Sequence, residues 1–118
     1  MSAILLTGLL SAYALNPTIG TLRIRQEWGQ LPQDLTAYEV FLAVEDCSLI
    51  GQEATLEIEG QSYDGMIFDC AGVNAYDEGQ SWMTTLGIAA EVDYHFWIDH
   101  PHLIGAEEAR ITVHGEGY

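Results

Sequence analysis

Three aspartates stand where apolar segments end, and they are the residues best placed for acid–base chemistry. Asp69 follows the apolar run 66–68, Asp93 follows the run 88–92, and Asp46 lies just after Ala43-Val44-Glu45. Apolar walls at the end of a buried strand favour the protonated form of a carboxyl group, as a general acid requires. We therefore expect Asp69 to be the leading catalytic residue, with Asp46 and Asp93 as neighbouring carboxylates.

The same aspartates also have structural interpretations. Asp69 would accept backbone N–H groups of the following loop, Asp46 would cap the turn at 48–50, and Asp93 would cap the turn that begins at Tyr94. A Ca²⁺ ion held by the three carboxylates is chemically reasonable, but the chain has no EF-hand spacing. A transition-metal site formed by His95, His100 and His102 is a further alternative. No zincin motif accompanies these histidines, so we expect them to be ordinary surface residues. We expect neither a metal nor a cofactor.

Cys47 and Cys70 are the only cysteines in the chain. A disulfide between them would close a loop of roughly 24 residues and contribute on the order of 3 kcal/mol. Two buried free thiols and a metal pair are the alternatives, and no CxxC spacing supports the second. A disulfide would indicate an extracytoplasmic location, either secreted or periplasmic.

The charge of the chain excludes two classes of partner. Asp and Glu number 18 against 3 Lys and Arg, which gives a formal net charge of −15. Phosphate backbones and anionic membrane surfaces are both bound through basic side chains, so we expect neither nucleic acid nor an anionic membrane as partner. Glycan binding and self-association remain open.

The N-terminal run 3–15 is mostly apolar. Ala12-Tyr13-Ala14 is similar to a signal-cleavage site, yet no Lys or Arg precedes the run, and the run is short for a membrane span. We expect a buried strand over 4–15, with a remnant leader as the alternative. Such a strand could also pair with a neighbouring chain and act as an intersubunit element.

Short strands alternate with single helical turns along the chain. The pattern predicts strands at 4–15, 37–44, 53–59, 62–69, 88–93 and 109–113, with a hairpin turn at 60–61 and a tail at 115–118. Short helices or turns are expected at 19–28, 46–51, 82–86 and 94–99. The fold class is therefore mainly β, and a small closed barrel is expected, because closure removes exposed sheet edges.

Four segments resemble the double-psi β-barrel, and the resemblance covers most of 37–114: Gly51-Gln52-Glu53-Ala54-Thr55-Leu56, Phe68-Asp69-Cys70-Ala71-Gly72, Ala89-Ala90-Glu91-Val92-Asp93-Tyr94 and Ala109-Arg110-Ile111-Thr112-Val113. The chain looks similar to barwin-like domains of the rare lipoprotein A type and to the three-aspartate domain of cell-wall lytic enzymes. The resemblance implies one domain over 1–118 with six strands, in which 4–36 supply the first strand and a short helix, and 37–114 the barrel core.

The resemblance also implies roles for residues. An aspartate associated with glycan cleavage in the lytic transglycosylases corresponds to Asp69, and a second corresponds to Asp93. Glu45 or Asp46 stands where the rare lipoprotein A type has a histidine. The usual Asp-Arg-Gly-Pro reads here as Asp69-Cys70-Ala71-Gly72.

Aromatic residues near these aspartates are candidates for stacking on sugar rings, with packing in the core as the alternative: Trp82, Tyr76, Tyr94 and Trp97. The expected function is a secreted domain that binds cell-wall glycan or acts on it as a lytic transglycosylase. The alternative is a non-catalytic structural subunit of an extracellular or viral assembly.

Overall fold

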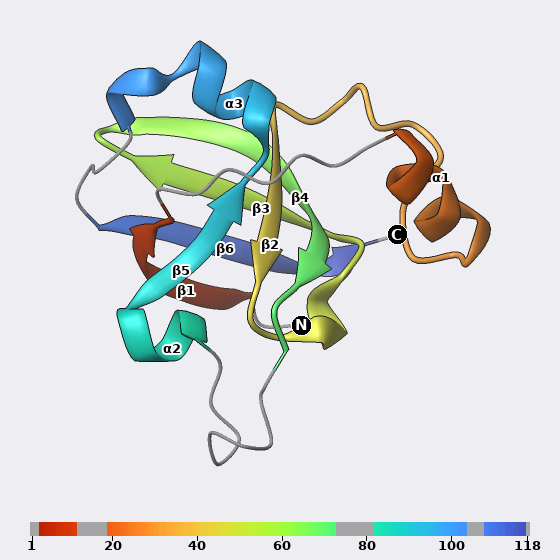
Figure 1. Cartoon of the computed structure of the whole chain (residues 1–118), viewed down its shortest axis with the longest axis horizontal. Coiled ribbons are helices and arrows are strands. Elements are labelled where there is room, and N and C mark those ends of the chain that lie inside the picture. The colour runs from red at the N-terminus through yellow and green to blue at the C-terminus, as the bar shows by residue number, and fades with distance from the viewer. Residues whose placement is uncertain (1–2, 12–18, 73–81, 104–107, 118) are drawn as a thin grey trace.

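The computed structural model describes residues 3–11, 19–72, 82–103 and 108–117. Six strands close into a barrel in the order β1-β5-β2-β4-β3-β6 (Figure 1), which confirms the expected mainly β barrel. The strands are β1 (Ile4–Leu10), β2 (Val40–Val44), β3 (Gln52–Ile58), β4 (Gln61–Cys70), β5 (Ile88–Val92) and β6 (Ala109–Gly117).

Short helices fill the connections, as expected. They are α1 (Ile19–Glu27), η1 (Cys47–Leu49), α2 (Trp82–Leu86), α3 (Tyr94–Asp99) and η3 (Pro101–Leu103). Gly29, with φ 71°, ends α1 in a Schellman arrangement in which Gln30 N donates to Arg25 O. Among these helices, none is long and apolar enough to cross a bilayer.

The barrel combines parallel and antiparallel pairs. β2 pairs with β4 in parallel and β1 pairs with β5 in parallel, whereas the other four pairings are antiparallel. β2 therefore lies between a parallel neighbour, β4, and an antiparallel neighbour, β5. Strands β2 and β4 end at the same end of the barrel, and β5 ends at the other.

Alternating side chains fill the barrel interior. On β3 the expected inward residues are buried, and β2 and β6 contribute in the same way: Ala54, Leu56, Ile58, Val40, Leu42, Val44, Ala109, Ile111 and Val113. The other face of β2 is also covered, because Ala43 is only 6 % exposed. Both faces of β2 therefore pack against other parts of the protein.

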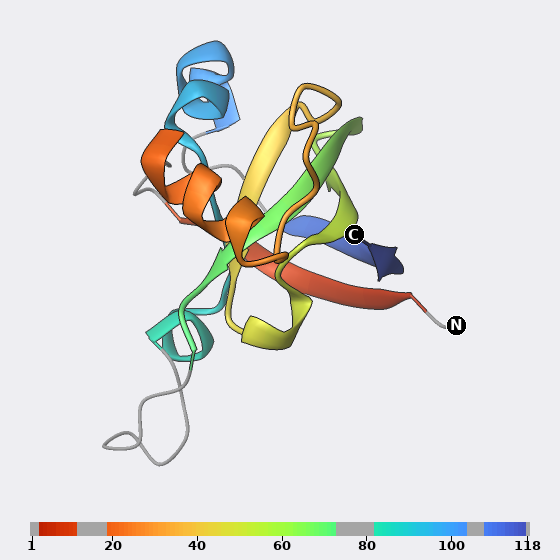
Figure 2. The ribbon, with the colours of Figure 1, turned by 90° about the vertical axis from the view of Figure 1, so that its right-hand side faces the viewer.

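A second apolar cluster lies on the outer wall. Leu31, from the connection after α1, is fully buried against Ala43, Met66 and Phe68. Gln26 Nε2 donates to the carbonyl oxygens of Pro32 and Gln33 and ties this connection to the helix. Figure 2 shows α1 held outside the barrel by this segment.

Several expected boundaries differ from the structure. The β3–β4 turn is formed by Glu59 (φ 50°) and Gly60 (φ 77°), one residue earlier than expected, because a two-residue type I′ turn requires positive φ at both central positions. The expected tail is wrong over 115–117, since Gly117 pairs with Gln52 and extends β6. β1 ends at Leu10, and 12–15 of the expected strand lie outside the described residues.

Two apolar residues at the C-terminal part of α1 are exposed. Trp28 is 70 % exposed just after the helix ends. Ile24, within the helix, is exposed as well. The segment is therefore held by Leu31 in the following loop, and the described part of the helix adds little apolar burial.

The two cysteines form a disulfide, as expected. Cys47 begins η1 and Cys70 ends β4, with an S–S distance of 2.03 Å. Val44 pairs with Cys70 across the parallel β2–β4 ladder, which places the two chain segments side by side before the bond forms. The bond therefore fixes the ends of two neighbouring strands.

Replacing both cysteines, Cys47→Ser with Cys70→Ser, should lower the free energy of unfolding by about 3 kcal/mol, because the unfolded chain loses the constraint of its closed loop. Urea unfolding of the two proteins measures the difference. The unreduced and reduced wild type should differ by a similar amount. Equal stability of all three proteins would show that the bond does not constrain the unfolded chain.

Gly51→Ala should destabilise the protein more than Gly60→Ala. Both glycines have positive φ, 92° and 77°, so both substitutions carry backbone strain. An added Cβ at Gly51 would collide with Gln30 O, whereas at Gly60 it would meet nothing within 4 Å. Overpacking adds about 1–3 kcal/mol. Thermal or urea unfolding of the matched pair measures the difference, and equal losses would contradict close contact between the α1–β2 loop and η1.

Candidate functional site

Asp69 of β4 and Glu91 of β5 lie on the outer wall of the barrel, on either side of β2. Both residues are register partners of Ala43 on β2, Asp69 from β4 and Glu91 from the opposite side. Residues at one register position of neighbouring strands project to the same face of a sheet. Ala43 belongs to the outer apolar cluster, so the two acids flank it on the outside of the barrel.

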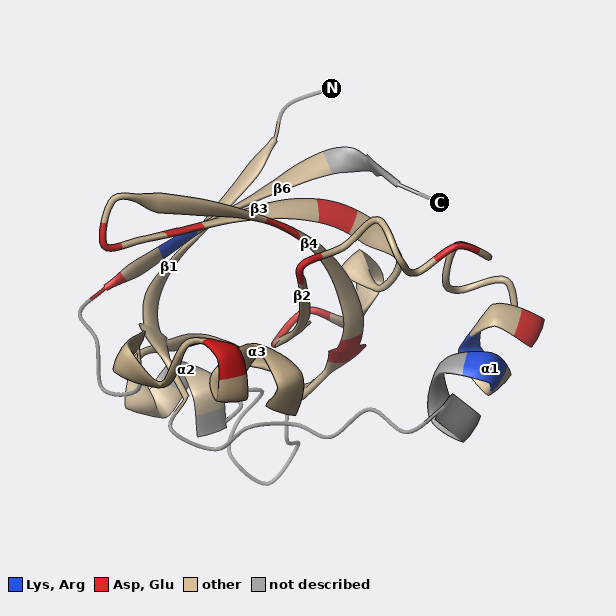
Figure 3. Cartoon of the chain, turned by 90° about the horizontal axis from the view of Figure 1, so that it is seen from above, with Lys and Arg blue, Asp and Glu red and all other residues tan. Residues whose placement is uncertain are grey.

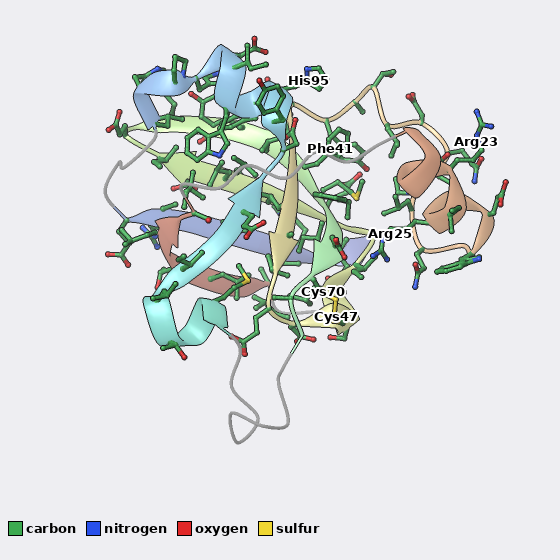
Figure 4. All side chains as sticks on the ribbon, viewed as in Figure 1. Arg23, Arg25, Phe41, Cys47, Cys70 and His95 are labelled. Atoms are coloured by element: carbon green, nitrogen blue, oxygen red, sulfur yellow. A yellow bond between two sulfur atoms is a disulfide. The ribbon has the colours of Figure 1, made fainter. Side chains whose placement is uncertain are left out.

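Arg25 of α1 reaches the Asp69 carboxylate. Arg25 Nη2 lies 2.7 Å from Asp69 Oδ1, and Arg25 Nη1 lies 3.0 Å from Gln30 Oε1. Cys70 N donates to the same Asp69 oxygen at 2.8 Å. Figure 4 shows Arg25 directed toward the end of β4 and Arg23 directed away from it. These donors hold the Asp69 carboxylate in place.

Glu91 is in a different environment. Its side chain is only 9 % exposed, and it is one of three buried polar residues in the described structure. Burial raises the pKa of Glu91 above its ordinary value, and the nearby charge of Asp69 raises the pKa further. The structure thus holds one carboxyl group that favours its proton beside another that is ion-paired.

Asp69 and Glu91, on either side of Ala43, are in unlike environments. Two carboxyl groups in unlike environments can take different roles, one as proton donor and the other as a charged group. Sequence reasoning assigned the proton-donor role to Asp69. The structure adds Glu91, which is buried and has a raised pKa, as a second candidate for that role, whereas Asp69 is ion-paired with Arg25.

Asp46 is held by the turn that follows it. Its carboxylate accepts hydrogen bonds from Ser48 N at 2.9 Å and Ser48 Oγ at 2.7 Å, as the N-cap of η1. The Ser48 hydroxyl and then the Ser48 N–H lower the pKa of Asp46. Asp46 lies at the disulfide end of the barrel, where with Glu45 it borders a cleft of about 400 Å³.

Asp93 lies at the other end of the barrel, so the expectation that three aspartates gather in one patch is wrong. Its carboxylate accepts from Phe41 N at 2.8 Å and from Phe96 N at 3.2 Å, and it caps α3. In Figure 4 Phe41 stands at the end of β2 opposite Cys47. The reason is strand direction, because β5 runs antiparallel to β2 while β4 runs parallel to it.

The proposed sugar-stacking residues are only partly described. Tyr94 is 51 % exposed at the start of α3, next to Asp93, and therefore at the end away from the disulfide. Trp97 is 4 % exposed and packs in the core. Tyr76 and the side chain of Trp82 lie outside the described residues. A stacking role for these residues stays a prediction.

The histidines and acids do not gather around one point. Within the described part of the chain, no three His, Cys, Asp or Glu side chains are placed to hold a metal ion. His100 stacks on Phe96 with ring centroids 4.3 Å apart, and Tyr63 contacts it edge-on at 4.9 Å. His100 is therefore half-buried in an aromatic cluster, whereas His95 and His102 are exposed.

Glu91 and Arg25 are the site residues that sequence reasoning missed. One signal was available for each. Glu91 is the single acid inside a short strand that is otherwise apolar on both faces, and Arg25 is one of three basic residues in the chain. In Figure 3 the basic positions lie on α1 and β6, while acidic positions are spread over several elements.

The stability effect of Glu91→Gln should depend on pH. Because its folded pKa is raised above the ordinary 4.5, the stability that protonated Glu91 contributes is present below that value and lost as pH rises through the folded pKa. The glutamine variant lacks this loss, so its stability relative to wild type should rise between about pH 4 and pH 8. Urea unfolding across that range measures the relative stability.

The Asp69→Asn background provides the control. Since the charge of Asp69 is one cause of the shift, the pH-dependent gain from Glu91→Gln should be smaller there. A stability difference that does not change with pH in either background would contradict a raised pKa of Glu91 at the outer wall.

The candidate site thus joins a buried Glu91, an ion-paired Asp69 and the arginine that holds it, on the outer wall at β4, β2 and β5. Asp46 and Asp93 have capping roles elsewhere. Comparisons with known proteins find no matching family model, no curated protein of significant similarity and no solved structure of significant similarity.

Proposed function

We propose that this chain is a double-psi barrel domain that binds cell-wall glycan and cleaves it as a lytic transglycosylase does, at the pair formed by Asp69 and Glu91. The observation that carries the proposal is the burial of Glu91 beside the ion-paired carboxylate of Asp69. The resemblance of the segment 68–72 to the lytic enzymes supplies the substrate class. The structure supplies the second carboxyl group.

In this mechanism Glu91 donates its proton to the glycosidic oxygen of the departing sugar. The C6 hydroxyl of the sugar that is left attacks its own C1 carbon, which closes a 1,6-anhydro ring as the C1–O bond breaks. The resulting carboxylate of Glu91 takes the hydroxyl proton, so the enzyme is restored and no water is consumed. Asp69 remains charged and stabilises positive charge that develops at C1.

Two features of the structure support the proposed double-psi topology and the proposed extracytoplasmic location. The two parallel pairings, β1 with β5 and β2 with β4, inside an otherwise antiparallel closed barrel support the double-psi topology. The disulfide supports an extracytoplasmic location, because such bonds persist in oxidising compartments. Both agree with a domain that meets cell-wall polymer outside the cytoplasm.

Incubation with purified peptidoglycan tests the proposal. The wild type should release anhydro-sugar products detectable by mass spectrometry. Glu91→Gln should reduce the rate by at least about 100-fold, since general acid catalysis contributes about 10²–10⁴-fold. Asp69→Asn should also reduce the rate, and Asp46→Asn, which keeps an oxygen that can cap η1, should leave it nearly unchanged.

Circular dichroism and urea unfolding show that each variant is folded before its rate is compared. Absence of anhydro products from folded wild type would overturn the glycan-cleaving function. Equal rates for wild type and Glu91→Gln would overturn the role of Glu91.

A non-catalytic structural subunit is the second candidate. It is favoured by the exposed apolar residues of β1, where Ile4, Leu5 and Leu9 are 42 %, 51 % and 47 % exposed. It is also favoured by the capping contacts of Asp46 and Asp93. Size-exclusion chromatography at increasing concentration tests self-association, and a monomer throughout would count against assembly from copies of this chain alone.

A further inference from the structure

A cleft opens at the disulfide end of the barrel, between β1 and the segments that face it. It has a volume of about 400 Å³, and β1, the β2–η1 connection, α2 and the start of β5 all contribute to it. Its lining is Leu5, Leu6, Thr7, Glu45, Asp46, Met83, Gly87, Ile88 and Ala89. The cleft lies apart from Glu91, which is not among these residues.

The edge of β1 that faces this cleft is not paired along its first half. Of the described strands, only β6 pairs with Ile4–Gly8, and pairing with β5 begins at Leu9. Leu9 N donates to Gly87 O at 3.0 Å, which is where the two strands come together. A Cβ on Gly8 would lie 2.6 Å from Gly87 O, so glycine permits this close approach. Before Gly8, no other strand among the described residues pairs with this edge.

The walls of the cleft are apolar and its rim is acidic. Met83 and Ala89 are buried, Leu6 and Ile88 are half-buried, and Leu5 is exposed. The rim carries Glu45 and Asp46 on one side. The Ser48 hydrogen bonds lower the pKa of Asp46, so this rim carries negative charge at neutral pH.

We propose that this cleft binds an extended peptide segment of a basic partner protein, added as a strand to the open edge of β1. Backbone groups of residues 4–7 would pair with the segment over about 13 Å, at about 3.3 Å per residue. Alternate apolar side chains of the segment would enter the cleft. Lysine or arginine side chains would meet Glu45 and Asp46 at the rim.

Charge decides between a basic partner and a second copy of this chain. The chain carries no lysine, three arginines and a formal net charge of −15, so two copies repel one another. Arg25 is already bound to Asp69. An added strand from another copy would therefore bring negative charge to a negative rim, whereas a basic segment brings the complement. This inference does not depend on glycan cleavage.

The probe is an acetylated and amidated hexapeptide of alternating valine and lysine. Titration into ¹⁵N-labelled protein should give saturable chemical-shift changes confined to 4–9, 45–46 and 83–89. An alternating valine–glutamate peptide should not bind. A valine–lysine peptide with N-methyl groups on alternate amides should not bind either, because it cannot form the strand ladder.

A matched pair of double variants isolates the rim. Glu45→Gln with Asp46→Asn should weaken binding about threefold to tenfold, as expected from two exposed charge pairs. Glu57→Gln with Glu59→Gln removes the same charge at a second cavity of about 250 Å³, on the β3–β4 hairpin, and should leave affinity nearly unchanged.

Several results would overturn the proposal. These are no saturable binding of the valine–lysine peptide, equal binding of its N-methylated form, shift changes centred outside the cleft, and equal weakening by the two double variants. Concentration-dependent self-association with shift changes at 4–9 would show that a second copy occupies the edge, and would overturn the choice of a basic partner. Sedimentation velocity without peptide measures that association.

Discussion

The candidate site depends on a one-residue shift of register between β2 and β4. Leu42 pairs with Ile67, but Ala43 pairs with Asp69, so Phe68 is the extra residue. Without the shift, Asp69 would pair with Val44, whose side chain fills the barrel interior. A carboxylate there would lose its hydration among apolar side chains, at a cost of several kcal/mol. The bulge turns Asp69 outward.

The outward position of Asp69 has consequences for the neighbouring elements. It places the carboxylate where Arg25 of α1 can bind it, and it leaves Phe68 to pack with Leu31 on the same wall. Together these contacts dock α1 and its following loop against the barrel. The same position brings the charge of Asp69 toward Glu91 across Ala43. One bulge thus sets an ion pair, an apolar contact and the environment of a second carboxyl group.

Much of the fold could be predicted from the sequence because it depends on local patterns. Alternation at Ala54, Leu56 and Ile58 indicated β3, and capping residues at Asp46 and Asp93 indicated the turns that follow them. The site depends instead on strand direction and register. No local pattern shows that β5 runs antiparallel to β2, which sends Asp93 away from the disulfide and brings Glu91 beside Asp69.

The negative net charge of the chain affects both the outer wall and the cleft at β1, and it limits which ligands each can bind. Ala43 belongs to the outer wall, and Glu45 and Asp46, which follow shortly after it in the chain, border the cleft. The two sites are therefore neighbours at the end of β2. With 18 acidic side chains against 3 basic ones, an anionic polymer would be repelled at both. An uncharged ligand at the wall would avoid that repulsion, because there Asp69 is ion-paired with Arg25 and burial raises the pKa of Glu91. The basic segment proposed for the cleft would gain from the same charge, so the ligands proposed for the two sites differ in charge.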